Sequence, residues 1–130
     1  MQFFSDAFVQ GHATAWETMA PGVRRQILTY DDSLMLVRVE FEAGGVGAPH
    51  QHVHSQATYI ESGEFEIVID GKAQVLKAGD SFYVSPNLLH GATARTAGVL
   101  LDTFSPIRED FMVGRPAQPA QPAQHETQVH

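Results

Sequence analysis

The chain has no cysteine, few basic residues and no long apolar run. Without cysteine, disulfides and thiolate metal ligands are excluded. Eight lysines and arginines stand against fifteen acidic residues, so nucleic acid is not expected as a partner. No segment approaches the roughly 18 apolar residues of a membrane span, and the first residues lack the pattern of a signal peptide. We therefore expect a cytoplasmic protein that binds neither membranes nor nucleic acid.

Helical periodicity is also scarce, and short β-branched and aromatic runs take its place. Asp and Ser in the turn at 31–33, and the Asp70-Gly71 pair, are typical of tight turns between strands. The predicted strands are 23–30, 34–42, 56–61, 64–70, 72–77, 81–85 and 98–105. The glycine-rich stretch 44–49 is interpreted as a sharp bend rather than a strand. Seven or eight short strands predict an all-β antiparallel sandwich or barrel.

The chain is long enough for one domain. Residues 1–22 are predicted to form an N-terminal arm that packs on the barrel or on a partner subunit. Residues 23–112 are predicted to form the barrel. Residues 113–130 contain Pro-Ala-Gln three times, and this composition predicts an extended or disordered tail.

Histidines alternate in the stretch GGVGAPHQHVHSQATYIESG, where His50, His52, His54 and Gln56 occupy every second position. On an extended chain, His50 and His52 project from the same side, about 7 Å apart, so that two imidazoles can converge on one ion. An isolated pair of this kind is more often a surface loop. We expect a turn near 53–55 to send His54 elsewhere; the alternative is that His54 replaces a neighbour as ligand.

A carboxylate stands among apolar residues in the stretch LLDTFSPIREDF. On a strand, Asp102 and Phe104 share one face, and a desolvated carboxylate beside a metal cavity is suited to moving protons. Arg108 has the geometry to bind a substrate carboxylate through two hydrogen bonds. The alternative is that Asp102 is exposed at a strand end and that Arg108 pairs on the surface with Glu109 or Asp110.

The alternating histidines, followed by Gln56 and then by a second segment ending in SPNLLHG, resemble the two sequence motifs of the cupin superfamily. The resemblance implies a single-domain double-stranded β-helix, or jelly-roll barrel, around a metal ion. The metal ligands that it implies are His50, His52, Gln56 and His90. Such uncharged donors leave the charge of a divalent cation uncompensated and make it a strong electrophile.

Further stretches of the sequence resemble one particular family within the cupin superfamily. The stretches YDDSLMLVRVEFEAG, YIESGEFE, KAGDSFYVSPNLLHG and LLDTFSPIREDF resemble the KdgF-type cupins of pectin and alginate breakdown, over nearly all of residues 16–111. The resemblance implies an enzyme that linearises 4,5-unsaturated uronate monosaccharides without redox chemistry. It implies roles in turnover or substrate binding for Asp102, Phe104 and Arg108.

The same resemblance implies a divalent cofactor (nickel, zinc, iron or manganese), an anionic sugar substrate and a homodimer. Two alternatives belong to other classes. One is a cupin dioxygenase, which needs redox-active iron or copper, although its usual acidic fourth ligand is replaced here by Gln56. The other is a non-catalytic uronate-binding cupin.

Overall fold

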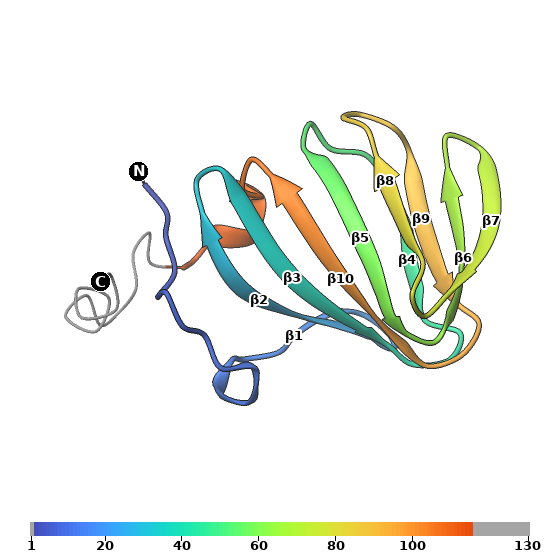
Figure 1. Ribbon diagram of the computed structural model, residues 1–130, viewed down its shortest axis with the longest axis horizontal. Coiled ribbons are helices and arrows are strands. Elements are labelled where there is room, and N and C mark those ends of the chain that lie inside the picture. The colour runs from blue at the N-terminus through green and yellow to red at the C-terminus, as the bar shows by residue number, and fades with distance from the viewer. Residues whose placement is uncertain (1, 116–130) are drawn as a thin grey trace.

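Two antiparallel sheets face one another in the computed structural model, which describes residues 2–115 (Figure 1). The larger sheet has the order β1-β2-β3-β10-β5-β8 and the smaller one β4-β9-β6-β7. The strands are β1 (Glu17–Ala20), β2 (Val23–Asp31), β3 (Leu34–Phe41), β4 (Val46–His50), β5 (Ser55–Ser62), β6 (Glu64–Ile69), β7 (Lys72–Lys77), β8 (Ser81–Val84), β9 (His90–Ala94) and β10 (Gly98–Ser105). Two short 3₁₀ helices, Gly11–Ala13 and Glu109–Met112, complete the described elements. The predicted all-β fold is confirmed.

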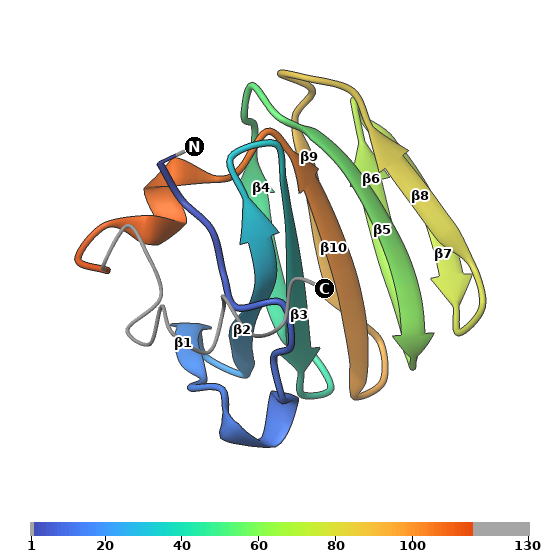
Figure 2. The ribbon, with the colours of Figure 1, turned by 60° about the vertical axis from the view of Figure 1, so that its left-hand side comes forward.

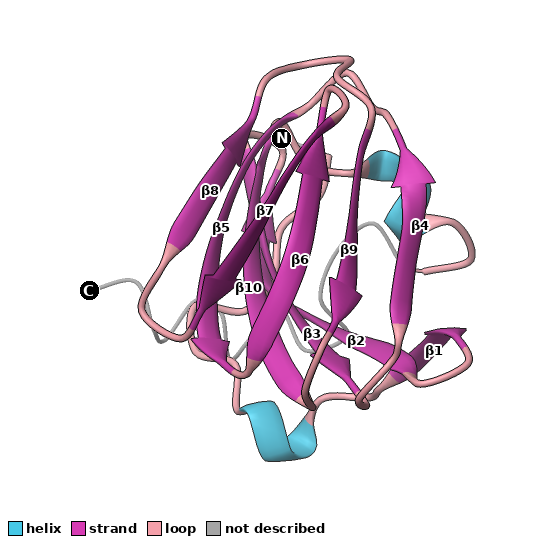
Figure 3. Ribbon diagram, turned by 90° about the vertical axis from the view of Figure 1, so that its right-hand side faces the viewer, coloured by secondary structure: helices cyan, strands magenta, loops and turns pink. Residues whose placement is uncertain are grey.

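The core lies between the sheets, which Figure 3 shows with β4, β9 and β6 in front of β3, β10 and β5. Side chains alternate along each strand, so that every second residue points inward. One apolar cluster joins both sheets and consists of Val23, Phe41, Ile60, Phe65, Ile67, Ala94 and Leu100. A second contains Ile27, Met35, Val37, Phe104, Ile107 and Met112.

Local turn chemistry accounts for two hairpins that the sequence predicts. The carboxylate of Asp31 accepts hydrogen bonds from the backbone N–H groups of Ser33 and Leu34, at 2.7 and 3.2 Å, between β2 and β3. Between β6 and β7, Asp70 and Gly71 have φ angles of 50° and 79°. Positive φ at both central residues is the geometry of a two-residue hairpin turn, and glycine adopts it without strain.

The glycine-rich stretch departs from the prediction, because β4 is a strand rather than a bend. It pairs with β9, with Val46 opposite Thr93 and Gly47 opposite Ala92. Neither β4 nor β9 was among the predicted strands. Their pairing is set by tertiary contact between distant segments rather than by local propensity, and β-propensity depends strongly on such context.

The N-terminal residues run beside β2 at the edge of the larger sheet (Figure 2). Phe4 forms an isolated bridge with Asp31, and the backbone N–H groups of Gln2 and Phe3 donate to the Asp32 carboxylate at 2.7 and 2.6 Å. The predicted domain bounds stay a prediction, and residues 116–130 of the predicted tail lie outside the described residues. Within residues 2–115, no helix has the length and apolar character needed to cross a membrane.

Candidate functional site

Three histidines meet at one end of the barrel, where β4 ends and β9 begins. His50 and His90 are register partners across the β4–β9 pair, and their ring centroids are 4.4 Å apart. His52 follows in the loop after β4, with its ring centroid 4.9 Å from that of His90. One ring nitrogen from each lies within 4.8 Å of the others. The predicted convergence of His50 and His52 is confirmed, and three histidines here are able to hold a metal ion.

The close approach of the two ligand-bearing strands depends on Gly91, which follows His90. A Cβ atom at this position would lie 3.0 Å from the carbonyl oxygen of Gly47 and 3.2 Å from the nitrogen of Pro49. Both contacts are with backbone atoms, which have little freedom to move away. Glycine therefore lets β4 lie against β9 at the point where His50 and His90 face each other.

Backbone carbonyls orient all three rings. The Nδ1 atoms of His50, His52 and His90 lie 3.0, 3.0 and 2.9 Å from the carbonyl oxygens of Ala48, His54 and Leu88. Because a carbonyl only accepts, Nδ1 carries the proton in each neutral ring and Nε2 keeps its lone pair. Metal-ligating histidines commonly have this outer hydrogen bond, which fixes the tautomer and the ring direction.

The environment of His90 fits a bound cation. Its side chain is 5% exposed, and its Nε2 atom is buried without a hydrogen-bond partner. Burial lowers the pKa of His90 to about 4, and it also lowers the pKa of His52. These rings are therefore neutral near pH 7, the form in which imidazole donates to a metal. A buried nitrogen with no partner is costly unless something occupies the position opposite it.

Gln56, on β5, adds an amide oxygen to the group. Its Oε1 lies 2.9 Å from Nε2 of His52, inside the barrel. His54 lies outside the cluster of three, because the chain bends at Val53 and His54 as expected. Three imidazoles and one amide therefore lie close together, and their role as metal ligands stays a prediction.

A carboxyl group lies next to this amide. Asp102 on β10 is the register partner of Thr58 on β5, and the Thr58 hydroxyl donates to it at 2.6 Å. The Nε2 of Gln56 lies 3.4 Å from the same carboxylate oxygen. Burial raises the pKa of Asp102 to about 6, although these two hydrogen bonds act in the opposite direction. The alternative that Asp102 is a water-exposed residue at a strand end does not fit this environment.

Phe104 and Arg108 border the same site from β10 and the segment after it. Phe104 is buried and packs edge-on against His52, with ring centroids 5.6 Å apart. Arg108 is only 7% exposed, and its Nε and Nη2 donate to the Asp110 carboxylate at 3.0 and 2.8 Å. The pairing with Asp110 was one of the two interpretations of Arg108. The sequence did not predict that the guanidinium is buried, because that interpretation placed the Arg108–Asp110 pair on the surface.

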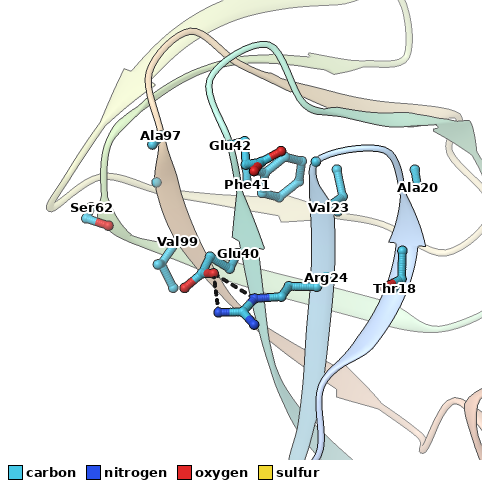
Figure 4. A pocket seen from close by; sticks show the side chains of 12 residues that line it. Thr18, Ala20, Val23, Arg24, Glu40, Phe41, Glu42, Ser62, Ala97 and Val99 are labelled. Carbon is cyan, nitrogen blue, oxygen red and sulfur yellow. Dashed lines mark hydrogen bonds and ion pairs between the residues drawn. The ribbon is translucent and has the colours of Figure 1, made fainter.

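A cavity of about 490 Å³ joins these groups. Six predicted site residues line it: His50, Gln56, His90, Asp102, Phe104 and Arg108. A larger hollow of about 630 Å³ lies elsewhere, around the ion pair of Arg24 and Glu40 (Figure 4). Its lining contains none of the predicted site residues, and of the two cavities the smaller one combines a half-buried carboxyl with converging imidazoles. We therefore take the smaller cavity as the candidate site.

Comparison with known proteins agrees with this geometry. A family model described as Cupin domain matches residues 37–104. The chain is 45% identical over 101 residues to the pectin degradation protein KdgF of Dickeya dadantii (strain 3937), covering 76% of this chain and 92% of that protein. The chain belongs to the KdgF family of cupins.

Solved structures extend the similarity to this family. The structure of KdgF from Halomonas sp. matches with 37% identity and a TM-score of 0.78, over 82% of this chain and 99% of that one. An RmlC-like cupin from Shewanella frigidimarina NCIMB 400 matches with 47% identity and a TM-score of 0.81, over 85% and 99%. The predicted resemblance to KdgF-type cupins and the single-domain cupin fold are confirmed.

Several polar or aromatic residues around the site were not predicted as functional. Thr58 was detectable in principle, since it stands two positions after Gln56 and therefore shares its face of β5. Arg25, Asp110 and Phe111 line the cavity itself, whereas Thr58 lies behind Gln56 and Asp102. No sequence signal brings Arg25 on β2 to Phe111, yet its guanidinium carbon lies 3.7 Å from the ring centroid.

Proposed function

We propose that this protein opens the ring of 4,5-unsaturated uronate monosaccharides, giving the linear 4-deoxy-5-keto-uronate in pectin and alginate breakdown. The observation that supports it most is the position of the Asp102 carboxyl, which is in hydrogen-bond contact with the amide of Gln56 beside the three histidines. Membership of the KdgF family supports the substrate class, because a relative is named a pectin degradation protein.

The reaction is an isomerisation with no electron transfer. The substrate is a cyclic hemiacetal whose ring oxygen joins C1 to C5 of an enol ether. When the bond between C1 and the ring oxygen breaks, the ring oxygen leaves as part of an enolate. The C1 hydroxyl loses its proton, and C1 becomes the carbon of an aldehyde. Protonation of C4 then gives the ketone at C5. One proton therefore moves from the C1 oxygen to C4.

His50, His52, His90 and the amide oxygen of Gln56 hold the divalent cofactor in this proposal. A cation at this point supplies positive charge that stabilises negative charge developing on a substrate oxygen. Imidazole accepts nickel, zinc, iron and manganese, so each of these metals is a candidate.

Asp102 moves the proton. Its pKa of about 6 lies near neutral pH, where a group exchanges protons most effectively in both directions. It takes the proton of the C1 hydroxyl as base and delivers it to C4 as acid. Phe104, which is 3% exposed, forms an apolar wall that keeps water from the enolate.

Arg108 binds the C6 carboxylate of the substrate. Its Nη1 has no hydrogen-bond partner among the described residues, whereas Nε and Nη2 are engaged by Asp110. The Phe111 ring centroid is 4.2 Å from the guanidinium carbon. This support holds the guanidinium in place before substrate arrives, which reduces the entropy lost on binding.

The proposal also includes a cytoplasmic homodimer. The cysteine-free composition suits a reducing compartment. Tyr59 of β5 and Tyr83 of β8 are 48% and 57% exposed on the larger sheet, and they supply apolar area for a second copy. Cell fractionation tests the compartment. Sedimentation of the wild type and of Tyr83→Lys tests the dimer, which the added charge is expected to weaken.

An ultraviolet assay tests the reaction. The C4–C5 double bond is conjugated with the C6 carboxylate and absorbs ultraviolet light until C4 is protonated. Purified protein loaded with nickel or zinc is expected to accelerate the loss of this absorbance, with pectin-derived and with alginate-derived unsaturated uronates. An unchanged rate with both substrates would refute the proposal. The same rate without oxygen separates it from a dioxygenase.

Replacing the proton-transfer group separates the enzyme from a uronate-binding protein. Asp102→Asn keeps the shape of the side chain but lowers turnover by about 10²–10⁴-fold, the usual contribution of general acid–base catalysis. Metal content, measured by elemental analysis, is expected to stay at the wild-type level. Wild-type turnover by this variant would remove Asp102 from the mechanism.

A further inference from the structure

A hydrogen-bonded chain of three side chains crosses the barrel interior behind the metal site. Nε2 of Gln56 donates to Oγ1 of Thr58 at 3.0 Å, and Oγ1 of Thr58 donates to the carboxylate of Asp102 at 2.6 Å. We propose that Thr58 is a positioning residue that orients the Gln56 amide, so that its oxygen and not its nitrogen faces the metal site.

The number of protons available decides which group donates in each of these two hydrogen bonds. The Thr58 hydroxyl has one proton, and the carboxylate of Asp102 accepts it. The hydroxyl is left with lone pairs only on the side of Gln56, so the group facing it must be the amide NH₂. The amide oxygen of Gln56 then points the other way. If the amide turned over, two oxygens without a proton between them would lie 3.0 Å apart.

The orientation of the Gln56 amide matters because its oxygen faces His52. His52 carries its proton on Nδ1, which bonds the carbonyl of His54, so its Nε2 is a lone pair. That lone pair lies 2.9 Å from the amide oxygen of Gln56. Two acceptors at this distance repel each other unless a positive group attracts both. Thr58 therefore holds in place an arrangement that the amide would leave if it were free to rotate.

The position of Thr58 suits this task. It is 1% exposed, and the register of β5 against β10 sets it opposite Asp102. Valine has nearly the same shape but neither donates nor accepts, so Thr58→Val would leave the amide NH₂ with only the 3.4 Å contact to Asp102. Serine keeps the hydroxyl and loses only a methyl group.

The inference rests on the proposed metal site, and metal affinity tests it separately from turnover. Nickel or zinc dissociation constants are measured by competition with a chromogenic chelator for the wild type, Thr58→Val and Thr58→Ser. We expect about tenfold weaker binding for Thr58→Val, the lower end of the usual loss when an outer partner of a ligand is removed, and less than threefold for Thr58→Ser. The matched control is Thr103→Val, on the exposed face of β10, for which affinity is unchanged.

A double-mutant cycle distinguishes orientation from a general structural effect. In a Gln56→Glu background both terminal atoms are oxygens, so the side chain cannot present the wrong end. We expect Thr58→Val to weaken metal binding less than threefold there. An equal loss in both backgrounds, or wild-type metal affinity for Thr58→Val, would overturn the inference. If the wild type and the Thr58 variants bind metal as expected but the wild type leaves unsaturated uronates unchanged, the proposed reaction fails while the role of Thr58 stands.

The hydrogen-bond partner of the amide is also visible without metal. In the metal-free protein, the two side-chain NH₂ protons of Gln56 are expected to exchange slowly, through slow rotation about the C–N bond, in the wild type and in Thr58→Ser. Thr58→Val is expected to show faster rotation. Identical signals in all three proteins would contradict the inference. Circular dichroism confirms that each variant is folded.

Discussion

The two ends of the barrel interior differ, although the same strands supply both: one is apolar, whereas the other combines polar groups with the second apolar cluster, which includes Phe104. Along the inward face of β5, the buried residues are Gln56, Thr58 and then Ile60. At one end the interior is apolar, with Phe41 and Phe65 packed edge to face at 5.1 Å. At the other end, imidazoles, an amide and a carboxyl group face one another. One strand therefore contributes to stability at one end and to chemistry at the other.

The difference shows where the fold gains and where it loses free energy. Apolar burial stabilises by about 25 cal/mol for each Å² removed from water, whereas a buried polar group without a full set of partners costs free energy. The raised pKa of Asp102 and the lowered pKa of His90 are measures of that cost. We expect changes at the apolar end to reduce stability, and changes at the polar end to reduce function while some of them increase stability.

The largest expected change in stability comes from the apolar end. Phe65 has no exposed surface, and Phe65→Ala is expected to lower the free energy of unfolding by about 3–5 kcal/mol, through lost burial and a cavity. Urea unfolding measures it. The matched control is Phe8→Ala, at an aromatic residue that is 72% exposed, with a much smaller loss. Equal losses for the two variants would show that the apolar end is not the main source of stability.

Acid is expected to destabilise the polar end through His90. Its pKa is lowered to about 4 in the folded protein, so between the ordinary value of 6.5 and 4 the unfolded chain binds a proton that the folded chain does not. Its contribution to stability is therefore complete above pH 6.5 and is lost as the pH falls towards 4. The full loss is about 3 kcal/mol.

The effect is measured on metal-free protein, as the difference in unfolding free energy between the wild type and His90→Asn from pH 7 to pH 4. This difference isolates His90 from the other titrating groups. The wild type is expected to lose more stability than the variant on acidification. Parallel pH profiles would contradict the burial of a neutral His90.

A smaller gain in stability is expected from Asp102→Asn. Because burial raises the pKa of Asp102 from 3.8 to about 6, the fold loses stability as the pH rises between these two values, and the neutral amide avoids this cost. At pH 8 the metal-free variant is expected to be more stable than the wild type by about 1–2 kcal/mol, and at pH 4 the difference disappears. Glu66→Gln, at an exposed position on β6, is the control and has no such effect. A loss of stability at pH 8 would contradict the prediction.

Local signals in the sequence were enough for much of the fold. The turns at Asp31 and at Asp70-Gly71 depend on residues adjacent in the chain, so the hairpins on either side were predicted correctly. The strand β4 was not, because its pairing partner lies more than forty residues away. A glycine-rich segment has too little side-chain information to reveal such a partner.

The candidate site, like the fold, was predicted from the sequence only where neighbouring residues determine the arrangement. His50 and His52 were predicted to converge because alternation along an extended chain acts over two residues. The burial of Arg108 was not predicted, because it depends on how the segment after β10 folds back onto the barrel. The same is true of the contact between Arg25 and Phe111, which joins residues from distant parts of the chain.

X-ray absorption spectroscopy of the nickel-loaded protein tests the central claim most directly, namely that the polar end of the barrel is a cation site made of uncharged donors. We expect one bound ion for each chain, with three imidazole ligands and the remaining positions filled by oxygen or nitrogen. His90→Ala is expected to reduce the imidazole count to two. Fewer than three imidazoles in the wild type, or a spectrum unchanged by His90→Ala, would contradict the account.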